Sequence, residues 1–247
     1  MKALYFTNKG KVRKNNEDAL LILSEVFSEE NFSDCKQKDI TQDSFIVAVA
    51  DGMGGHEKGE VASKIVLETL RQLSPLKTEE DIRNVLNTAR QKLEDYAKEH
   101  SDAFGLGCAV AGMIVNAGNS IAFNVGDCRV YRYINNKLIK LTRDHSVVEE
   151  LVLDGIISRQ EARVHPKRNV LTSAIIGDGN STELNIFTTE VNMDLGGIFL
   201  ICSDGLWDEL EDEEIQKCIS SNNPCEEFLN VINTKPLRDN VSFIILL

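Results

Sequence analysis

The sequence predicts an α+β fold in which antiparallel β-sheets are flanked by helices. Strand-like segments dominate both halves of the 247-residue chain, and helical segments come in groups between them. This order does not alternate strand and helix as the βαβ units of a parallel sheet do. The length is enough for one substantial core, and no internal repeat or linker-like tract divides it. We therefore expect a single domain over residues 1–247.

Strands are predicted where β-branched and aromatic residues run between turn formers. The first half contains 3–7, 18–24, 44–50 and 108–115. The second half contains 120–126, 130–134, 137–141, 184–191, 197–202 and 241–247. Asn135-Asn136 suits a two-residue hairpin because asparagine tolerates positive φ. The polar, aperiodic residues 25–43 are expected to form a surface loop.

Helices are predicted from apolar residues that recur at helical intervals. Residues 57–73 and 79–100 show this pattern and are expected to form two amphipathic helices joined around Pro75. Shorter helices are expected at 146–153, 212–220 and 224–233. The stretch 145–183 is otherwise mixed and irregular.

Composition excludes several classes of partner. The net charge of −12 would repel phosphate backbones, so we expect no nucleic-acid or anionic-membrane partner. This acidity either keeps the protein soluble or reflects a cluster of carboxylates that cations neutralise. The N-terminus lacks the apolar stretch of a signal peptide, and no run reaches membrane-spanning length. A cytoplasmic location is therefore expected.

The six cysteines are scattered and include no CxxC pair. Zinc sites need clustered ligands, and disulfide scaffolds are usually short and secreted, so neither is expected. Cys108, Cys128 and Cys202 stand in apolar runs and are expected to be small core residues.

Five aspartate-bearing turns adjoin predicted strands: Asn16-Glu17-Asp18, Asp51-Gly52, Gly126-Asp127, Ser203-Asp204-Gly205 and Arg238-Asp239-Asn240. Strand ends gather at one edge of a sheet, so these carboxylates have the opportunity to converge. Converging carboxylates repel one another unless cations lie between them. Oxygen ligands favour hard ions such as Mg²⁺ or Mn²⁺. Taken singly, each Asp-Gly pair is an ordinary turn former, but five beside strands favour a metal centre.

Two features near these turns have alternative interpretations. The turn in VAVADGMGGHEKGEVAS lacks both GxxxxGK[ST] and GxGxxG, which disfavours a nucleotide cradle. Its glycines are better explained as room for the backbone, so that the Gly52 carbonyl joins the Asp51 carboxylate on one ion. Arg13, five residues before Asp18, is either a surface charge or a guanidinium that binds two phosphate oxygens.

Seven stretches, in order, resemble the metal-dependent PP2C-type (PPM) serine/threonine protein phosphatases, and their bacterial-style branch in particular. They are GKVRKNNEDA, VAVADGMGGHEKGEVAS, NVGDCRVYRY, LTRDHS, HPKRNVLTSAIIGDG, ICSDGLWDEL and RDNVSFIIL. The resemblance covers nearly the whole chain. It implies a four-layer αββα sandwich of two antiparallel sheets flanked by helices, with a metal centre at one end. It also implies a flap over about 145–183 that influences substrate selection.

The resemblance implies a centre of two Mn²⁺ or Mg²⁺ ions. Asp51 looks like the carboxylate that bridges both ions, with the Gly52 carbonyl on one of them. Asp204 and Asp239 resemble further ligands.

Five more residues acquire roles from the resemblance. Glu17 and Asp18 look like ligands or water-holders, and Asp127 resembles the residue that holds a third, weaker ion in bacterial members. Arg13 matches the phosphate-binding arginine, and Asn240 is expected to fix the neighbouring aspartate and its water shell.

The implied mechanism is attack by a hydroxide formed from a water shared by two cations, while Arg13 offsets charge on the phosphoryl oxygens. Many eukaryotic members have a histidine two residues after the bridging aspartate, proposed as the acid for the leaving alkoxide. Here that position is Met53. His56 is a weaker candidate for this acid, and a metal-bound water could replace it.

The expected function is hydrolysis of phosphoserine and phosphothreonine in proteins, with Arg13 and Asp51 in the leading catalytic roles. The expected partners are phosphoproteins that a serine/threonine kinase modifies, and the enzyme is expected to be a monomer. One alternative is a catalytically weak regulator that only binds phosphoproteins, which the complete set of ligands disfavours. Another is a hydrolase of small phosphomonoesters or nucleotides, which the lack of a nucleotide motif disfavours.

Overall fold

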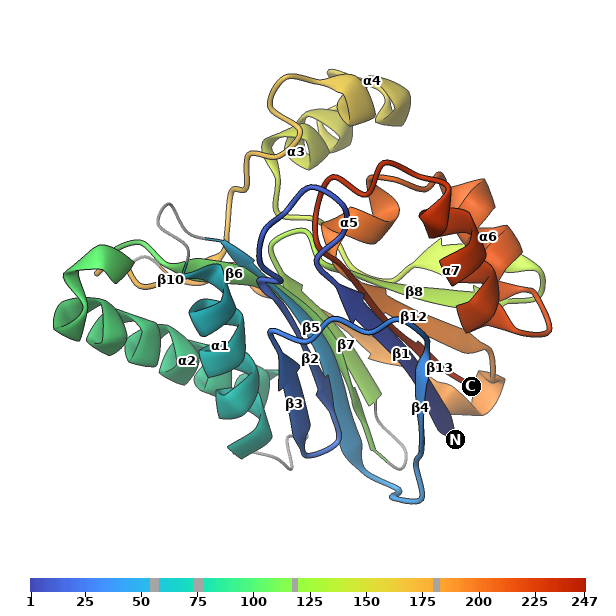
Figure 1. The fold of residues 1–247 in the computed structure, drawn as a ribbon, viewed down its shortest axis with the longest axis horizontal. Coiled ribbons are helices and arrows are strands. Elements are labelled where there is room, and N and C mark those ends of the chain that lie inside the picture. Colours follow the sequence, from blue (N-terminus) through green and yellow to red (C-terminus); the bar gives the residue numbers. More distant parts are fainter. Residues whose placement is uncertain (54–57, 73–77, 117–119, 180–182) are drawn as a thin grey trace.

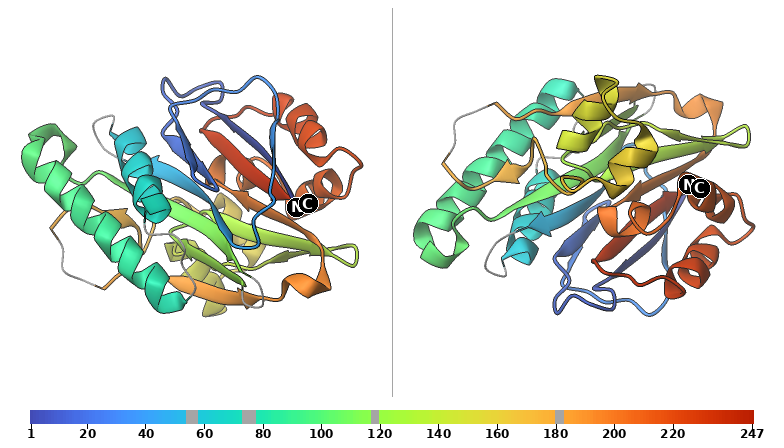
Figure 2. Two further views of the ribbon diagram at one scale, coloured as in Figure 1. Left: turned by 90° about the horizontal axis from the view of Figure 1, so that it is seen from below. Right: turned by 90° about the horizontal axis from the view of Figure 1, so that it is seen from above.

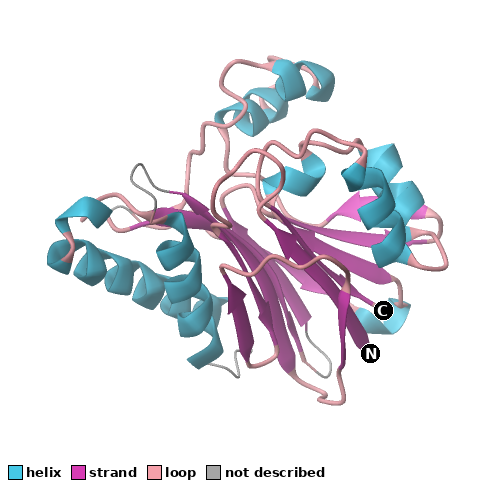
Figure 3. Cartoon of the chain, viewed as in Figure 1, coloured by secondary structure: helices cyan, strands magenta, loops and turns pink. Residues whose placement is uncertain are grey.

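The computed structural model describes residues 1–53, 58–72, 78–116, 120–179 and 183–247. These residues form two antiparallel sheets packed face to face, with helices on both outer sides (Figure 1). Figure 3 shows the same arrangement by element type, with strands inside and helices outside. The predicted four-layer α+β sandwich is confirmed.

Each sheet combines strands from distant parts of the chain. The six-stranded sheet has the order β4 (Lys36–Asp39), β1 (Lys2–Asn8), β13 (Val241–Leu246), β12 (Ile198–Cys202), β8 (Arg129–Ile134) and β9 (Lys137–Lys140). The seven-stranded sheet has the order β11 (Phe187–Val191), β7 (Ser120–Val125), β6 (Gly107–Val115), β5 (Phe45–Met53), β2 (Asp18–Ile22) and β3 (Glu25–Ser28), and β10 (Ile175–Ile176) pairs with β6.

The helices cover the outer faces of both sheets (Figures 1 and 2). On the seven-stranded sheet lie α1 (Gly59–Gln72) and α2 (Glu79–Glu99); on the six-stranded sheet lie α5 (Asp204–Trp207), α6 (Asp212–Ile219) and α7 (Pro224–Asn233). Two single 3₁₀ turns stand at Ser101–Ala103 and Met193–Leu195. Within the described ranges, no helix is both long and apolar enough to cross a membrane.

The core has three buried layers. Residues such as Leu20, Val49 and Ile201 fill the space between the sheets. Separate clusters join each sheet to its helices. Strands β5 and β6 are covered on both faces, which explains their unbroken apolar runs FIVAVA and CAVAGMIV.

The hairpin at Asn135-Asn136 is confirmed, because both residues adopt positive φ, at 50° and 60°. The predicted surface loop over 25–43 is wrong in part, since it contains the edge strands β3 and β4. Edge strands are exposed on one side and carry polar residues, so their sequence resembles that of a loop. Pro75, the expected junction of the first two helices, lies outside the described residues.

The stretch 145–183 divides into two parts. Its first part forms α3 (Val147–Leu153) and α4 (Arg159–Val164), which stand above one end of the sandwich (Figure 1). Its second part returns to the seven-stranded sheet as β10. From here on, the name flap refers to residues 146–171, the part of the expected flap (about 145–183) that contains α3 and α4.

Four cysteines are free and buried: Cys108, Cys128, Cys202 and Cys218. The core positions predicted for the first three are therefore confirmed. Cys35 and Cys225, 190 residues apart in the sequence, form a disulfide. This bond corrects the expectation of a chain without disulfides, and it ties the segment before β4 to the first turn of α7.

Reduction of the Cys35–Cys225 bond should lower the free energy of unfolding by about 3 kcal/mol, because the bond closes a long loop and so restricts the unfolded chain. Urea denaturation with and without dithiothreitol measures this difference. The Cys35→Ser/Cys225→Ser double variant should not respond to the reductant. Equal stability of the wild-type protein in both buffers would contradict the prediction.

Candidate metal centre

Aspartates from both sheets reach one end of the sandwich. Asp18 at the start of β2 lies directly opposite Asp51 on β5. Asp127 follows β7, Asp204 follows β12 and Asp239 precedes β13. The structure brings Asp51, Asp127, Asp204 and Asp239 to one pocket, and Asp18 lies beside it as the strand partner of Asp51.

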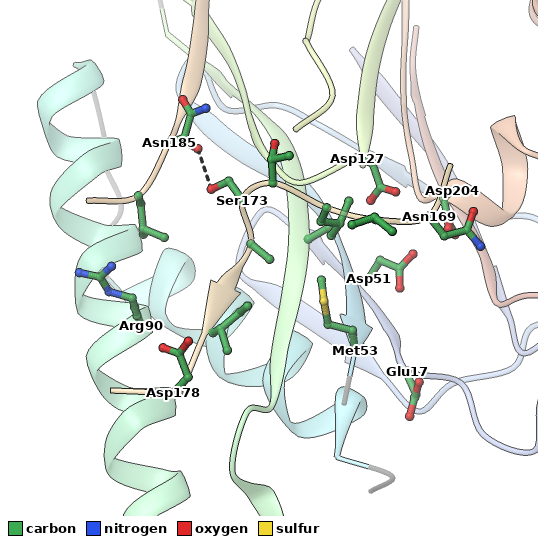
Figure 4. Close-up of a pocket in the computed structure, with 18 of the residues that line it drawn as sticks. Glu17, Asp51, Met53, Arg90, Asp127, Asn169, Ser173, Asp178, Asn185 and Asp204 are labelled. Atoms are coloured by element: carbon green, nitrogen blue, oxygen red, sulfur yellow. Dashed lines mark hydrogen bonds between the residues drawn. The ribbon is translucent and has the colours of Figure 1, made fainter. Parts of the chain in front are cut away.

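A pocket of about 750 Å³ opens at this edge. At one end it is lined by Arg13, Glu17, Asp51, Gly52, Asp127, Asp204 and Asp239. Figure 4 shows Asp51, Asp127 and Asp204 grouped at that end, while Arg90 and Asp178 lie at the other. Asp18 does not line the pocket; it is completely buried.

Burial and mutual repulsion raise the pKa values of these carboxyl groups. Burial is the largest cause for Asp18, whose pKa rises to about 7, and for Asp204, whose pKa rises to about 6. The pKa values of Asp51 and Asp127 also lie well above the usual range because of burial and then of the neighbouring aspartates.

The chemistry of this donor set fits hard divalent cations. The side chains offer carboxylate oxygens, and one buried oxygen each of Asp18 and Asp204 has no hydrogen-bond partner among the residues that the structure describes. Within the described ranges, no three His, Cys, Asp or Glu side chains are arranged so that they could already hold a metal ion. The carboxylates thus line one pocket, and cations would draw them together.

Arg13 contacts one of the predicted ligands directly. Its Nη2 donates to Oδ2 of Asp239 at 2.6 Å, with half of the arginine side chain exposed. This hydrogen bond, together with the charges of Glu17 and Asp51, raises the pKa of Arg13. The predicted position of Arg13 beside the carboxylates is therefore observed, and its guanidinium reaches the pocket from an open rim.

Gly52 allows a close approach between β5 and the start of α1. A Cβ atom there would lie 2.1 Å from the Gly59 carbonyl oxygen and 2.6 Å from that of Glu17. The Gly52 N–H donates to the same Glu17 carbonyl at 3.1 Å. The interpretation of these glycines as room for the backbone thus has a physical basis.

Asn240 holds the loop that carries Arg13 and Glu17. Its Oδ1 accepts from the Glu17 N–H at 2.8 Å, and its Nδ2 donates to the carbonyls of Lys9 and Asn15. The expectation that Asn240 fixes Asp239 is met only by its backbone N–H, which donates to Asp239 Oδ1 at 2.9 Å.

His56, the uncertain acid, lies outside the described residues, while Met53 lines the pocket. Ser203 was missed from the sequence; its Oγ donates to Asp18 at 2.8 Å. Its place directly before Asp204-Gly205 was the available signal. Arg90 and Asp178 were missed as well: Arg90 comes from α2 and carries no motif, and Asp178 stands in the stretch HPKRNVLTSAIIGDG but was given no role of its own.

Two antiparallel sheets between helix pairs, with an acidic pocket where the strand ends meet, are the arrangement expected of a metal-dependent phosphatase. A family model described as Protein phosphatase 2C matches residues 31–242. A serine/threonine phosphatase stp of Listeria welshimeri is 32% identical over 243 residues, which is 95% of this chain and 89% of that protein. The chain belongs to the protein phosphatase 2C family, which is metal-dependent.

Solved structures agree with this assignment. Serine/threonine phosphatase Stp1 from Staphylococcus aureus superposes with a TM-score of 0.80 at 29% identity, covering 98% of this chain and 93% of that one. The catalytic domain of the phosphatase PstP, solved in complex with two manganese ions, has a TM-score of 0.74 at 24% identity, covering 99% and 98% of the two chains. The latter likeness concerns the fold.

Metal-free protein should lose stability as the pH rises from 6.5 to 8.5. The pKa of Asp18 is near 3.8 unfolded and about 7 folded, so folding favours its protonated form, and that contribution disappears as pH rises through 7. We expect a loss of about 1 kcal/mol over this range, most of it below pH 7.5, because one pKa unit corresponds to about 1.4 kcal/mol and the loss from Asp18 stops once the pH passes its folded pKa of about 7. His145, whose pKa falls to about 4 because it is buried, has the opposite effect below pH 6.5, so the measurement starts there.

Urea denaturation in EDTA at pH 6.5, 7.5 and 8.5 measures this loss. The same series in Mn²⁺ is the control, because cations that replace the protons should abolish the fall. Stability that stays flat or rises with pH in EDTA would refute the assignment of raised pKa values.

Proposed function

We propose that this chain is a metal-dependent serine/threonine protein phosphatase whose centre uses the predicted residues. The observation that carries the proposal is the group of aspartates with raised pKa values beside Arg13, at the open end of a protein phosphatase 2C fold. Such a group is unfavourable by itself and becomes favourable when divalent cations bind.

The proposed ligands come from both sheets. Asp51 would bridge two ions with help from the Gly52 carbonyl, Asp204 and Asp239 would complete the pair, and Asp127 would hold a third, weaker ion. Mn²⁺ or Mg²⁺ would supply an activated water and stabilise charge on the phosphoryl oxygens. Glu17, which lines the pocket, and Asp18, which is buried opposite Asp51, would bind the ions or hold their waters.

Arg13 would bind and orient the phosphoryl group. Its guanidinium is half exposed and donates to Asp239 from the rim, so a phosphate entering the pocket would meet it first. A fork of N–H donors suits two phosphate oxygens. A cation held by Asp239 would compete with Arg13 for this carboxylate, and the Arg13 guanidinium would then bind phosphate.

The substrates would be phosphoproteins modified by a serine/threonine kinase. The pocket continues from the carboxylates to Arg90 and Asp178 (Figure 4), which leaves room for residues beside the phosphorylated one. We further propose a monomeric, cytoplasmic enzyme with one catalytic domain over residues 1–247. The Cys35–Cys225 disulfide is unusual for a reducing compartment.

The deciding experiment is phosphate release from a phosphothreonine peptide by purified protein with Mn²⁺, compared with EDTA and with nucleotide substrates. Metal-dependent release from the peptide supports the proposal. Mn²⁺ binding without turnover would favour a phosphoprotein-binding regulator. Faster hydrolysis of nucleotides would favour a small-molecule hydrolase.

Asp51→Asn and Asp239→Asn should each abolish phosphatase activity, by a factor of at least about 1,000, because they remove ligands that the mechanism needs. Asp51→Asn should also stabilise the metal-free protein at pH 8, since it removes one of the repelling carboxylates. Activity assays and urea denaturation in EDTA measure the two effects. Asp34→Asn, at an exposed carboxylate on the segment before β4, is the control. A less stable metal-free Asp51→Asn protein would count against the electrostatic explanation.

Arg13→Met should raise KM for a phosphothreonine peptide about tenfold or more, because a charge-assisted hydrogen bond to phosphate is lost. It should also tighten Mn²⁺ binding, since Asp239 is released from its ion pair. Steady-state kinetics and calorimetry test both effects. Lys14→Met, a neighbouring exposed cation, should behave like the wild-type protein. Unchanged KM in Arg13→Met would exclude a role in phosphate binding.

A further inference from the structure

The stretch LTRDHS at residues 141–146 has no role in the chemistry described above, yet its central part is buried. Thr142, Asp144 and His145 are at most 5% exposed. They lie beneath the turn that joins β7 to β8 and carries Asp127. This turn passes from one sheet to the other, and Asp127 stands between the two strands rather than on either of them.

His145 binds both polar groups of Gly126, the residue before Asp127. The Gly126 N–H donates to His145 Nδ1 at 3.1 Å, and the His145 N–H donates to the Gly126 carbonyl at 2.8 Å. Because Nδ1 accepts, the proton of the neutral ring is on Nε2. Within the described residues, Nε2 has no hydrogen-bond partner, so Nδ1 is the polar contact of this ring.

The turn has little freedom apart from these bonds. Gly126 has a φ of +92°, and a Cβ atom there would lie 2.4 Å from that of Ala109. Asn124 Nδ2 donates to the Gly126 carbonyl at 3.0 Å and to that of Arg143 at 2.9 Å. The backbone before Asp127 is thus held from two sides by side chains that lack charge.

A second chain of contacts fixes Asp127 itself. Its carbonyl accepts from Trp207 Nε1 at 3.0 Å, and the Trp207 ring lies 3.5 Å from the guanidinium carbon of Arg129. Asp144 binds that guanidinium at 2.6 Å. Arg129 and Lys140 keep the pKa of Asp144 low despite its burial. Residues 144 and 145 therefore support Asp127 by separate routes.

His145 also closes the base of the flap. Its carbonyl accepts from the Thr172 N–H at 2.8 Å, the Val147 N–H donates to the Val170 carbonyl at 2.9 Å, and Ser146 forms a β-bridge with Leu171. Val170, Leu171 and Thr172 line the pocket. We call the place where these two segments meet, 145–147 and 170–172, the neck of the flap. His145 therefore contacts both the turn that carries Asp127 and this neck.

We propose that His145 is a positioning residue that fixes the carboxylate of Asp127 for a divalent cation and couples this cation position to the neck of the flap. The inference rests on the proposed function only in taking Asp127 as a metal ligand. A buried histidine is costly compared with an apolar residue of the same size, so its acceptor must contribute something that packing alone does not. The acceptor bond to Gly126 is that contribution.

The test separates the acceptor from the shape of the ring. His145→Asn keeps an acceptor at the δ position, whereas His145→Leu fills similar space without one. His165→Leu is the matched control, because His165 Nδ1 also accepts a backbone N–H, that of Lys167 at 3.1 Å, but does so within the flap. Asp127→Asn serves as the reference for a lost ligand.

Calorimetry with Mn²⁺ alone is the main measurement. His145→Leu should weaken the site that Asp127→Asn removes by about tenfold or more, as loss of a residue that orients a ligand typically does. His145→Asn should stay within about threefold of the wild-type affinity, and His165→Leu should match it. The His145→Leu/Asp127→Asn double variant should bind no worse than Asp127→Asn, because both changes act on one site.

The flap provides a second readout. In His145→Leu, Mn²⁺ should no longer protect the amides of Val147 and Thr172 from hydrogen exchange, whereas His145→Asn should retain this protection. If His145→Leu does not fold, His145→Gln replaces it, since its acceptor stands at the ε position, away from Gly126.

Several results would overturn the proposal. One is equal Mn²⁺ affinity in the Asn, Leu and Gln variants, and another is a loss of thermal stability in EDTA without a change in Mn²⁺ binding. Failure of the wild-type protein to hydrolyse phosphopeptides would refute the proposed function but leave these binding results interpretable.

Discussion

Repulsion among aspartates at one end of the sandwich is the constraint on which the rest of the site depends. Asp18, Asp51, Asp127 and Asp204 have raised pKa values, each mainly through burial and then through neighbouring carboxylates, which include Asp239. Separately, each would be a tolerable buried carboxyl group; together they oppose folding whenever they are ionised. The three apolar layers hold the strand ends in place against this repulsion. The same arrangement makes the binding of cations at the mouth of the pocket favourable.

The surrounding groups position the carboxylates without neutralising most of them. Ser203 donates to Asp18, Asn240 holds the backbone of Glu17, and Gly52 lets two backbones meet. All three contributions are uncharged. Arg13 is the guanidinium in direct contact, and it sits at the exposed rim on Asp239 rather than among the buried aspartates. Different groups therefore position the carboxylates and neutralise their charge. Uncharged groups position the buried aspartates, and bound cations would neutralise them.

Local sequence predicted the parts of this structure that depend on local patterns. Apolar runs marked the central strands because β5 and β6 are covered on both faces, and helical spacing marked α1 and α2. The edge strands β3 and β4 were predicted as part of a loop, because their exposed side gives them a polar composition. The aspartates at the strand ends were identifiable, but the contacts of the Asn240 side chain were not predicted, since its partners are more than 220 residues away. The Cys35–Cys225 pair was beyond prediction for the same reason: no local signal joins segments so far apart.

Asp127 shows why a metal ligand sometimes needs supports from distant sequence. Asp51 gains its orientation from its own strand and from its antiparallel partner Asp18. Asp127 stands on a turn between the two sheets, where strand pairing does not fix it. Its geometry depends on contacts from other segments: Trp207 of α5, and the segment that follows β9 and opens into the flap. A residue that holds the turn from that segment also contacts the flap, and this shared contact is the basis of the coupling that we propose between cation and flap.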